Sequence, residues 1–292
     1  MDSAHEIREF LATRRAKITP QQAGLPAFGS GNRRVPGLRR EEVALLAGVS
    51  IDYYARLERG QLAGASEEVL DALCHALQLD DAERSHLRDL AAAQRRRPAR
   101  RATRRAKTTV PASLKRVLES MTGSPAFIRN GRLDILAVND LGRALYAPLF
   151  TTAAPTPVNI ARFQFLDPTS RNYFPDWNAS VNTTVSLLRT EVGRAPTDSE
   201  LTGLIGELVT RSDEFRAAWA KHNVRLHHTG RKPFRHPAVG EFTLDFDAMQ
   251  LPGHAGLTLT AYSAEPGTPD HDSLMLLASW AATEQERVDT ES

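Results

Sequence analysis

Residues 41–60, EEVALLAGVSIDYYARLERG, form an apolar helix pattern that is interrupted between Gly48 and Ser50. Glycine readily adopts the left-handed conformation that closes a helix, and a serine side chain caps the first turn of the next one. The break therefore predicts two short helices joined by a tight turn, with Tyr54 and Leu57 on the buried side. In such a helix-turn-helix, the second helix can enter the major groove of DNA.

The outer face of the second helix carries a mixed set of side chains. Ile51 and Tyr53 are poorly explained by solubility, and they suit contacts to thymine methyl groups, base edges or phosphates. An ordinary helical hairpin in a core is the alternative interpretation, but the turn, the caps and the basic excess favour DNA binding. The predicted DNA-binding residues are Arg33, Arg34, Arg39, Arg40, Ser50, Ile51, Asp52, Tyr53 and Arg56. The four arginines between residues 33 and 40 are expected to contact phosphates.

The charge of the chain is divided unevenly. The 292 residues, 41% of them apolar, suffice for two domains with separate cores, and their formal net charge is +2. Residues 1–110 carry 20 Lys and Arg against 14 Asp and Glu, whereas the remainder carries 17 against 21. The stretch QRRRPARRATRRAK, residues 94–107, holds eight of these cations and no acid, which predicts a solvated linker that could also lie along a phosphate backbone.

The cellular setting is indicated by what the chain lacks. No apolar run approaches the roughly 18 residues of a membrane span, and the start has no secretory signal pattern. The single cysteine, Cys74, lies among leucines at helical spacing and is predicted to be a buried structural thiol. A cytoplasmic protein without membrane association is therefore expected.

The N-terminal region is predicted to be all-α. Helical patterns cover residues 3–17, 39–47, 50–59 and 66–79, and a fifth begins at residue 80, where Asp80 and Glu83 have capping-box spacing. The predicted organisation is a helix-turn-helix DNA-binding domain at 1–93, a basic linker at 94–110, a ligand-binding or dimerisation domain at 111–283 and a tail at 284–292.

The C-terminal region mixes strands and helices. A hairpin is expected around Asn130-Gly131, helices at 181–192 and 198–221, and strands in GEFTLDFDAMQL and GLTLTAYSAE. The two strands alternate, with Phe242, Leu244 and Phe246 in one and Leu257, Leu259 and Ala261 in the other, so each is expected to have one wet face. Helices on the apolar side would make an α+β layer that can hold a ligand.

Enzymatic and metal chemistry find no support in the sequence. No nucleophile elbow or phosphate-binding loop is present, so no catalytic residues, no cofactor and no enzyme activity are expected. His222, His227, His228 and His236 lack the spacing of a metal site and stand among cations that repel a divalent ion. His236 is predicted to be structural, with its ring donating to a carbonyl.

The chain resembles a family of regulators over most of residues 5–281. The stretches PGLRREEVALLAGVSIDYYARLERG (36–60), ILAVNDLGRALY (135–146), NIARFQFLDP (159–168) and GRKPFRHPAVGEFTLDFDAMQLP (230–252) resemble Xre-family bacterial transcriptional regulators of the MmyB-like actinobacterial type. The resemblance implies a lambda-repressor-like helix-turn-helix domain and a PAS-like domain that senses small, apolar, fatty-acid-like molecules. Val138 stands where such regulators often have Trp, which leaves the ligand size open.

Two further expectations concern the ligand and the partners. The predicted ligand-binding residues are Asn139, Phe163, Tyr173, Trp177, Trp219, His222 and Arg225. Cations that could hold a carboxylate are Arg225, Arg231, Lys232 and Arg235. A homodimer on a pseudo-palindromic operator of double-stranded DNA is expected. The alternative is a C-terminal domain that serves only for dimerisation or protein interaction.

Overall fold

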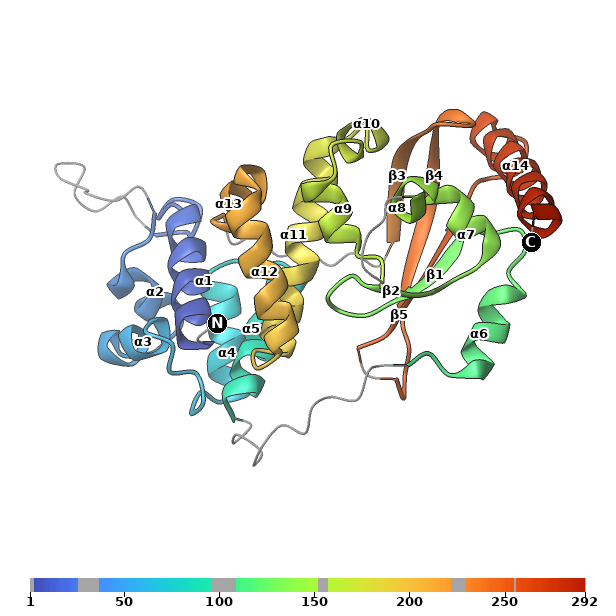
Figure 1. The fold of residues 1–292 in the computed structure, drawn as a ribbon. Helices are drawn as coiled ribbons and strands as arrows, with labels where there is room; N and C mark the ends of the chain where they lie inside the picture. The colour runs from blue at the N-terminus through green and yellow to red at the C-terminus, as the bar shows by residue number, and fades with distance from the viewer. Residues whose placement is uncertain are drawn as a thin grey trace. The chain divides into compact units, whose positions relative to one another are not determined.

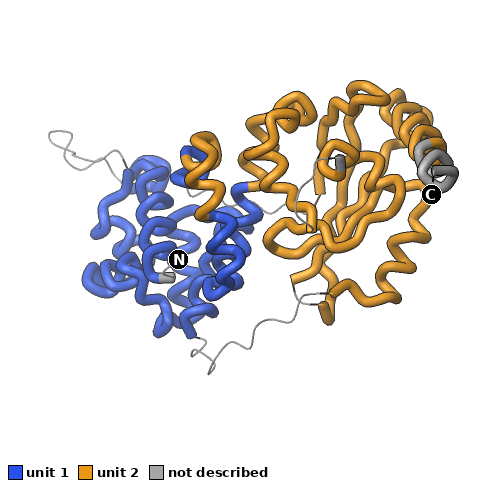
Figure 2. The backbone as a smooth tube through the Cα atoms, in the orientation of Figure 1, with its two compact units in different colours: residues 1–102, 185–205, 217–226 blue, residues 103–184, 206–216, 227–292 orange. Residues whose placement is uncertain are grey.

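The computed structural model describes residues 3–25, 37–95, 109–151, 157–221, 229–254 and 256–291 (Figure 1). The chain divides into two compact units (Figure 2). Unit 1 comprises residues 1–102, 185–205 and 217–226, and unit 2 comprises residues 103–184, 206–216 and 227–292. None of the helices in the described ranges has the length and apolar character needed to cross a membrane.

The N-terminal part of unit 1 contains the five predicted helices. They are α1 (Ser3–Lys17), α2 (Arg40–Leu46), α3 (Ile51–Glu58), α4 (Glu67–Ala76) and α5 (Asp81–Arg95). Ile7, Phe10 and Leu11 of α1 are fully buried in a core to which all five helices contribute. Cys74 is a buried free thiol in the same core, as predicted, and burial raises its pKa.

Side chains cap the starts of α4 and α5, the start of α5 as predicted. The backbone N–H of Glu83 donates to Asp80 Oδ1 at 2.9 Å, and the backbone N–H of Asp80 donates to Glu83 Oε2 at 3.2 Å, which is a reciprocal capping box. The Ser66 hydroxyl accepts from the Val69 N–H at 3.4 Å at the start of α4. These side chains satisfy amides that a helix start leaves without an intrahelical partner.

Nine further helices follow in the described ranges. They are α6 (Ala112–Glu119), α7 (Asp140–Leu145), α8 (Ala147–Thr151), α9 (Ile160–Leu166), α10 (Ser170–Tyr173), α11 (Trp177–Arg194), α12 (Ser199–Arg211), α13 (Asp213–Trp219) and α14 (Pro269–Glu291). The single helix expected at 198–221 is wrong, because Ser212 interrupts it and its hydroxyl accepts from the Phe215 N–H at 3.1 Å to start α13. Residues 284–291, predicted as a tail, continue α14.

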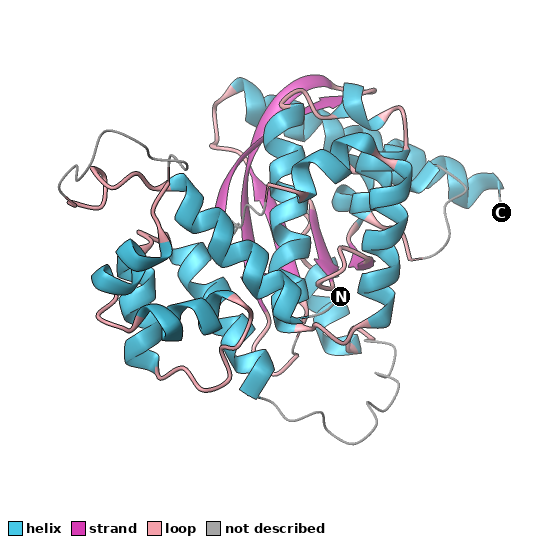
Figure 3. Cartoon of the chain, turned by 90° about the vertical axis from the view of Figure 1, so that its left-hand side faces the viewer, coloured by secondary structure: helices cyan, strands magenta, loops and turns pink. Residues whose placement is uncertain are grey.

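Unit 2 is built on one antiparallel sheet of five strands in the described residues, drawn in magenta in Figure 3. The strands are β1 (Ala126–Arg129), β2 (Ile135–Val138), β3 (Thr229–His236), β4 (Gly240–Gln250) and β5 (Thr258–Ser263), in the order β2-β1-β5-β4-β3. The β1–β2 hairpin and the strands β4 and β5 confirm the predicted elements, whereas β3 was not predicted. The α+β class of this part of the chain is confirmed.

The sheet has an aromatic face and a second apolar face. The cross-strand register places Phe127, Lys232, Phe234, Phe242, Phe246 and Tyr262 on the aromatic face. Ala126 and Ile128 face the other way and cluster with Leu118 of α6. β1, for which no exposed face was predicted, is buried on both sides. In β5 the buried alternation falls on Thr260 and Tyr262, because Leu259 and Ala261 pack only partly against the second cluster.

Candidate functional site

The turn between α2 and α3 has the predicted geometry. Gly48 has a φ of 64°, and the Val49 N–H reaches back to the Ala44 carbonyl at 3.0 Å, so the freed carbonyls of α2 are satisfied. The Ser50 hydroxyl accepts from the Tyr53 N–H at 3.1 Å and caps α3. The turn thus redirects the chain while leaving few unsatisfied backbone groups at either helix end.

The outer face of α3 is open to solvent. Tyr54 and Leu57 are buried, as predicted, whereas Ile51 is 53% exposed. Arg56 is exposed as well, and Tyr53 is half-buried, with the Arg56 guanidinium 5.4 Å from the centre of the Tyr53 ring. This pairing fixes a cation and an aromatic side chain next to each other on the exposed face.

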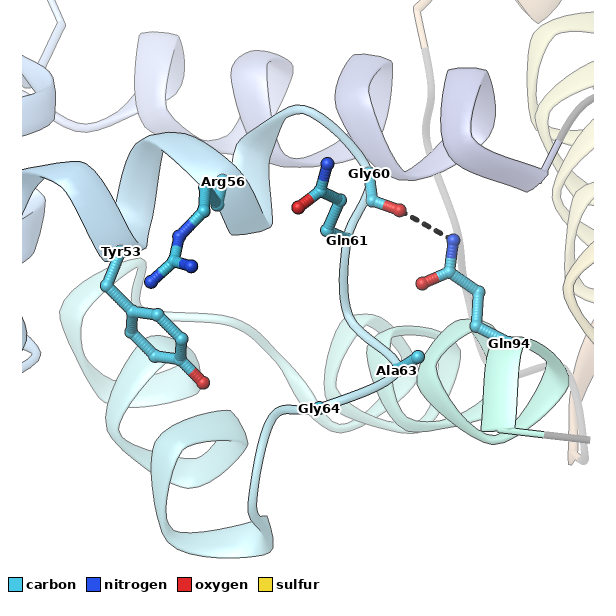
Figure 4. A pocket seen from close by; sticks show the side chains of 7 residues that line it. All are labelled: Tyr53, Arg56, Gly60, Gln61, Ala63, Gly64 and Gln94. Atoms are coloured by element: carbon cyan, nitrogen blue, oxygen red, sulfur yellow. Dashed lines mark hydrogen bonds between the residues drawn. The ribbon is translucent and has the colours of Figure 1, made fainter.

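A hollow of about 470 Å³ lies beside this face (Figure 4). Its lining residues are Tyr53, Arg56, Gly60, Gln61, Ala63, Gly64 and Gln94. The Gln94 amide donates to the Gly60 carbonyl at 2.6 Å and accepts from the Leu62 N–H at 2.7 Å. The loop after α3 is therefore tied to the end of α5, which gives the hollow a fixed wall.

A buried carboxylate organises the arginines on the other side of α3. Glu58 is only 1% exposed and accepts from Arg15 Nε at 2.8 Å and from Arg40 Nε. Arg15 also donates to the Leu38 carbonyl at 2.9 Å. Hydrogen bonding to Glu58 raises the pKa of Arg40, whose side chain remains 58% exposed. An arginine held in this way keeps a charged surface for a phosphate.

A second hollow, of about 400 Å³, lies at these arginines and is lined by Arg15, Arg39, Arg40, Glu41 and Ile51. Arg39 precedes α2 as its N-cap residue. Its backbone N–H donates to Glu42 Oε2 at 2.6 Å, and its guanidinium lies 3.3 Å from Glu41. The structure therefore brings Arg39, Arg40 and Ile51 together. Arg33 and Arg34 fall outside the described residues.

Sequence reasoning missed Arg15 and Glu58 at this site. The available signal was the helical spacing that places Glu58 on the same side as Tyr54 and Leu57. A carboxylate on a buried face needs a cationic partner, since an unpaired buried charge is costly. One such partner, Arg15, lies 43 residues away from Glu58 in the sequence, so local spacing could not identify it.

Buried aromatic rings pack against the aromatic face of the sheet, and together with that face they form what we call the aromatic layer of unit 2. Of the predicted ligand residues, Phe163 and Tyr173 lie in this layer. Their ring centres are 5.9 Å apart, and the Tyr173 hydroxyl donates to the Leu145 carbonyl. Both side chains are buried, and burial raises the pKa of Tyr173 well above its ordinary value. Tyr173 is thus a neutral phenol whose hydroxyl hydrogen is used in the hydrogen bond to the Leu145 carbonyl.

Asn139 serves as a helix cap in this structure. Its side-chain oxygen accepts from the backbone N–H groups of Ala126 at 2.9 Å and Gly142 at 2.8 Å. Its side-chain amide donates to the carbonyls of Met121 at 2.7 Å and Ser124 at 2.8 Å. These four bonds use the hydrogen-bonding capacity of the amide, so its role as a ligand contact stays a prediction.

The remaining predicted ligand residues are spread over the chain. Trp177 is half-buried and stacks with Arg171, whose guanidinium lies 5.0 Å from the ring centre. Trp219 belongs to unit 1, where the Arg189 guanidinium lies 4.1 Å from its ring. His222 and Arg225 lie outside the described residues, and the structure tests neither.

The cations predicted to hold a carboxylate are separated by β3. Arg231 and Arg235 lie on the face of the sheet opposite the aromatic layer. There Arg231 pairs with Asp245 at 3.4 Å, and Arg235 pairs with Glu241 at 2.6 Å. Lys232 points to the opposite side and lies against aromatic rings. The expected cluster is therefore wrong for these three residues, because alternate side chains of a strand face opposite sides.

His236 has the predicted structural role. Its Nδ1 accepts from the Ala238 N–H at 3.2 Å, so Nε2 carries the hydrogen that is donated to the Ala144 carbonyl at 3.0 Å. Burial lowers the pKa of His236, which favours this neutral form. Within the described ranges, no group of three or more His, Cys, Asp or Glu could hold a metal ion, and His222, His227 and His228 lie outside them.

Comparison with protein families gives two matches. The MmyB-like transcription regulator ligand binding domain matches residues 110–277, which is more than half of the chain. A helix-turn-helix domain matches residues 6–87, the range that contains α2, α3 and all residues that line the two hollows except Gln94. Comparison with curated proteins finds no match.

Proposed function

Because the chain belongs to the regulators with an MmyB-like ligand-binding domain, and also carries a helix-turn-helix domain, we propose that it is a sequence-specific DNA-binding regulator controlled by an apolar, fatty-acid-like ligand. A ligand-sensing transcription regulator is what the two family matches support. The base contacts, the ligand class and the assembly state belong to this proposal.

The observation that carries the DNA-binding part is the exposed face of α3 beside arginines that Glu58 holds in place. Ile51, Asp52, Tyr53 and Arg56 read base edges, while Arg39 and Arg40 contact phosphates on the flank. Arg33 and Arg34 extend the phosphate contacts, and Ser50 sets the start of α3. The protein binds as a homodimer to a pseudo-palindromic operator, since two-fold readers present two such helices one DNA turn apart.

The ligand-binding part is supported by the aromatic layer of unit 2. Phe163, Tyr173 and the rings on the aromatic face of the sheet form a buried apolar environment within the residues matched by the ligand-binding family. Trp177, Trp219, His222, Arg225 and Asn139 remain candidates for this site. The protein acts where the chromosome is, so we propose a cytoplasmic location.

Operator binding by single variants tests the DNA-binding part. Fragments retained from a genomic library are first footprinted, and affinity is then measured from 50 to 200 mM salt. Arg40→Ala should reduce the log–log salt slope by about 0.9, as expected for one lost phosphate contact. Tyr53→Ala should lower the preference for operator over random DNA with little change in the slope.

The matched control is Arg88→Ala. Arg88 is an exposed arginine of α5 that pairs with Asp71 of α4 at 2.6 Å, and it lies outside both hollows. It should bind like the wild type. If operator affinity and salt slope are unchanged in both Arg40→Ala and Tyr53→Ala, the proposed DNA contacts are refuted.

The alternative role of the C-terminal domain, dimerisation alone, predicts that no apolar ligand changes operator affinity.

A further inference from the structure

Lys232 of β3 faces the aromatic layer of unit 2. In β3, Lys232 and Phe234 share a face with Gly230, and Lys232 stands opposite Leu244 of β4. Its ammonium lies 4.5 Å from the centre of the Phe174 ring and 5.4 Å from that of Phe234. The other two cations of β3, Arg231 and Arg235, point the other way and have acidic partners.

The surroundings of Lys232 leave its positive charge without an anion. Across the described residues, no carboxylate forms a salt bridge with this ammonium, and its hydrogen bond is to the Tyr146 hydroxyl at 3.2 Å. Burial lowers the pKa of Lys232 to about 7. Aromatic faces attract a cation but do not neutralise it, so an anionic group would stabilise the charged form.

The tyrosines beside Lys232 add hydrogen-bond donors. The hydroxyls of Tyr146 and Tyr262 are 2.6 Å apart, and they share one hydrogen bond although each carries a hydrogen. Burial raises the pKa of Tyr146 well above its ordinary value and that of Tyr262 to about 12, which keeps both hydrogens in place. When Lys232 is protonated, the second hydrogen has no acceptor among the described residues, whichever hydroxyl donates to the other.

The donors therefore exceed the acceptors in this cluster. The ammonium of Lys232 has three N–H groups, of which Tyr146 accepts one. Arg129 is also buried on this face of the sheet, and its charge opposes, without reversing, the upward pKa shift that burial causes in Tyr146 and Tyr262. A carboxylate accepts hydrogen bonds through both oxygens and carries the missing charge, whereas an alcohol or ester has no charge.

We propose that Lys232, Tyr146 and Tyr262 bind the carboxylate of an apolar acid whose hydrocarbon part packs on Phe174 and Phe234. The inference rests on the proposed ligand-sensing function and deepens it. The aromatic layer accepts the apolar part of the ligand, and the cluster selects acids from alcohols and esters of the same length.

The test compares two probes of equal chain length, dodecanoate and dodecan-1-ol, by calorimetric titration of the full-length protein at pH 7. The wild type should bind dodecanoate about tenfold or more tighter than the alcohol, as a charge-assisted hydrogen bond provides. K232M should lose this preference while it keeps its affinity for the alcohol. R231M is the control, because Arg231 is a neighbour on β3 with its own acidic partners, and it should behave like the wild type.

Tyr262→Phe provides a second variant that keeps the lysine. It removes one hydroxyl from the cluster and should reduce the preference for dodecanoate less than K232M does. Equal binding of both probes by the wild type, or a full preference retained by K232M and Tyr262→Phe, overturns the carboxylate site and leaves an apolar sensor standing. Binding of neither probe overturns both this site and the proposed ligand class.

Discussion

At the scale of single residues, Glu58 is the side chain on which the proposed phosphate-contacting surface, formed by Arg39 and Arg40, depends. Glu58→Gln keeps its shape but removes the charge that holds Arg15 and Arg40. We expect the free energy of unfolding to fall by about 2 kcal/mol, since hydrogen bonds between charged groups contribute this much and both arginines can still reach water. Urea denaturation measures the change, and operator affinity should fall with it.

Glu41→Gln is the control for this prediction. Glu41 is exposed and pairs with the exposed Arg39 at 3.3 Å, an arrangement that contributes little. Its substitution should change stability by less than about 0.5 kcal/mol. Equal effects of the two substitutions would mean that Glu58 does not act as an organising carboxylate.

Lys232 leads to a second prediction, which concerns pH. Its pKa of about 7 in the folded protein lies below the ordinary 10.5, so the folded chain loses this proton first as the pH rises, and the unfolded chain keeps it. Stability should therefore increase from pH 7 to 8.5 through this group, because the unfolded state binds more protons in this window. At pH values about one unit or more below 7, both states are protonated and the effect is flat.

The measurement is the difference in melting temperature between the ligand-free wild type and K232M. Subtraction removes the contributions of other groups, and methionine has no charge to titrate. The difference should move in favour of the wild type as the pH rises from 7 to 8.5. A constant difference over this range would show that Lys232 keeps its proton in the folded protein.

At the same scale, the sequence predicted the exposed side chains of α3 in part, because burial on a short helix follows its 3.6-residue period. Ile51, Asp52 and Arg56 are exposed, whereas Tyr53 is half-buried and packs against the core. The sequence did not predict what those side chains contact. The Arg15–Glu58 pair joins residues 43 positions apart, and Lys232 meets Tyr146 across 86. Pairs this distant depend on the fold, which local spacing does not determine.

At the scale of elements, the turn between α2 and α3 depends on the positive φ of Gly48. A Cβ atom there would meet nothing within 4 Å, so Gly48→Ala should cost only the strain of the left-handed conformation, about 1 kcal/mol. Gly60 also has a positive φ, and its added Cβ would lie 2.5 Å from the Ala4 carbonyl oxygen of α1. Gly60→Ala should therefore be clearly more destabilising than Gly48→Ala.

Urea denaturation followed by circular dichroism ranks these variants. Gly64→Ala is the control, because its Cβ would also stand in open space and its backbone is not left-handed. It should be neutral or slightly stabilising, through a less flexible unfolded chain. A Gly48→Ala protein as stable as Gly64→Ala would show that the left-handed turn is not required.

The elements that the sequence did not reveal have physical reasons. β3 contains two arginines, a lysine and a proline, which hide the alternation of Lys232, Phe234 and His236 on one face. Proline is compatible with β3 because this strand is the last in the sheet order. The helices α1–α5 were more predictable, since their caps and apolar periods lie within a few residues of each other.

At the scale of the whole molecule, the sequence predicted a division at the basic linker. The structure adds residues 185–205 and 217–226 to unit 1, and these follow the linker by many residues. Within this unit, Arg189 of α11 is fully buried, pairs with Glu6 of α1 and donates to the Trp219 carbonyl. Local composition cannot reveal a pair that joins residues 183 positions apart. The predicted domain boundaries, which follow the change in charge along the chain, therefore remain a prediction.

The buried pair between Glu6 and Arg189 supports the last prediction. Burial lowers the pKa of Arg189 and the charge of Glu6 opposes this shift, so each charge depends on the other. Arg189→Met leaves a carboxylate that is 2% exposed without this partner, and the expected loss of stability is about 3–5 kcal/mol. Glu6→Gln with Arg189→Met should lose less than the sum of the two single substitutions, because neither charge is then left behind. Urea denaturation of the four proteins in this cycle measures the coupling, and additive losses would show that the two side chains do not stabilise unit 1 as a pair.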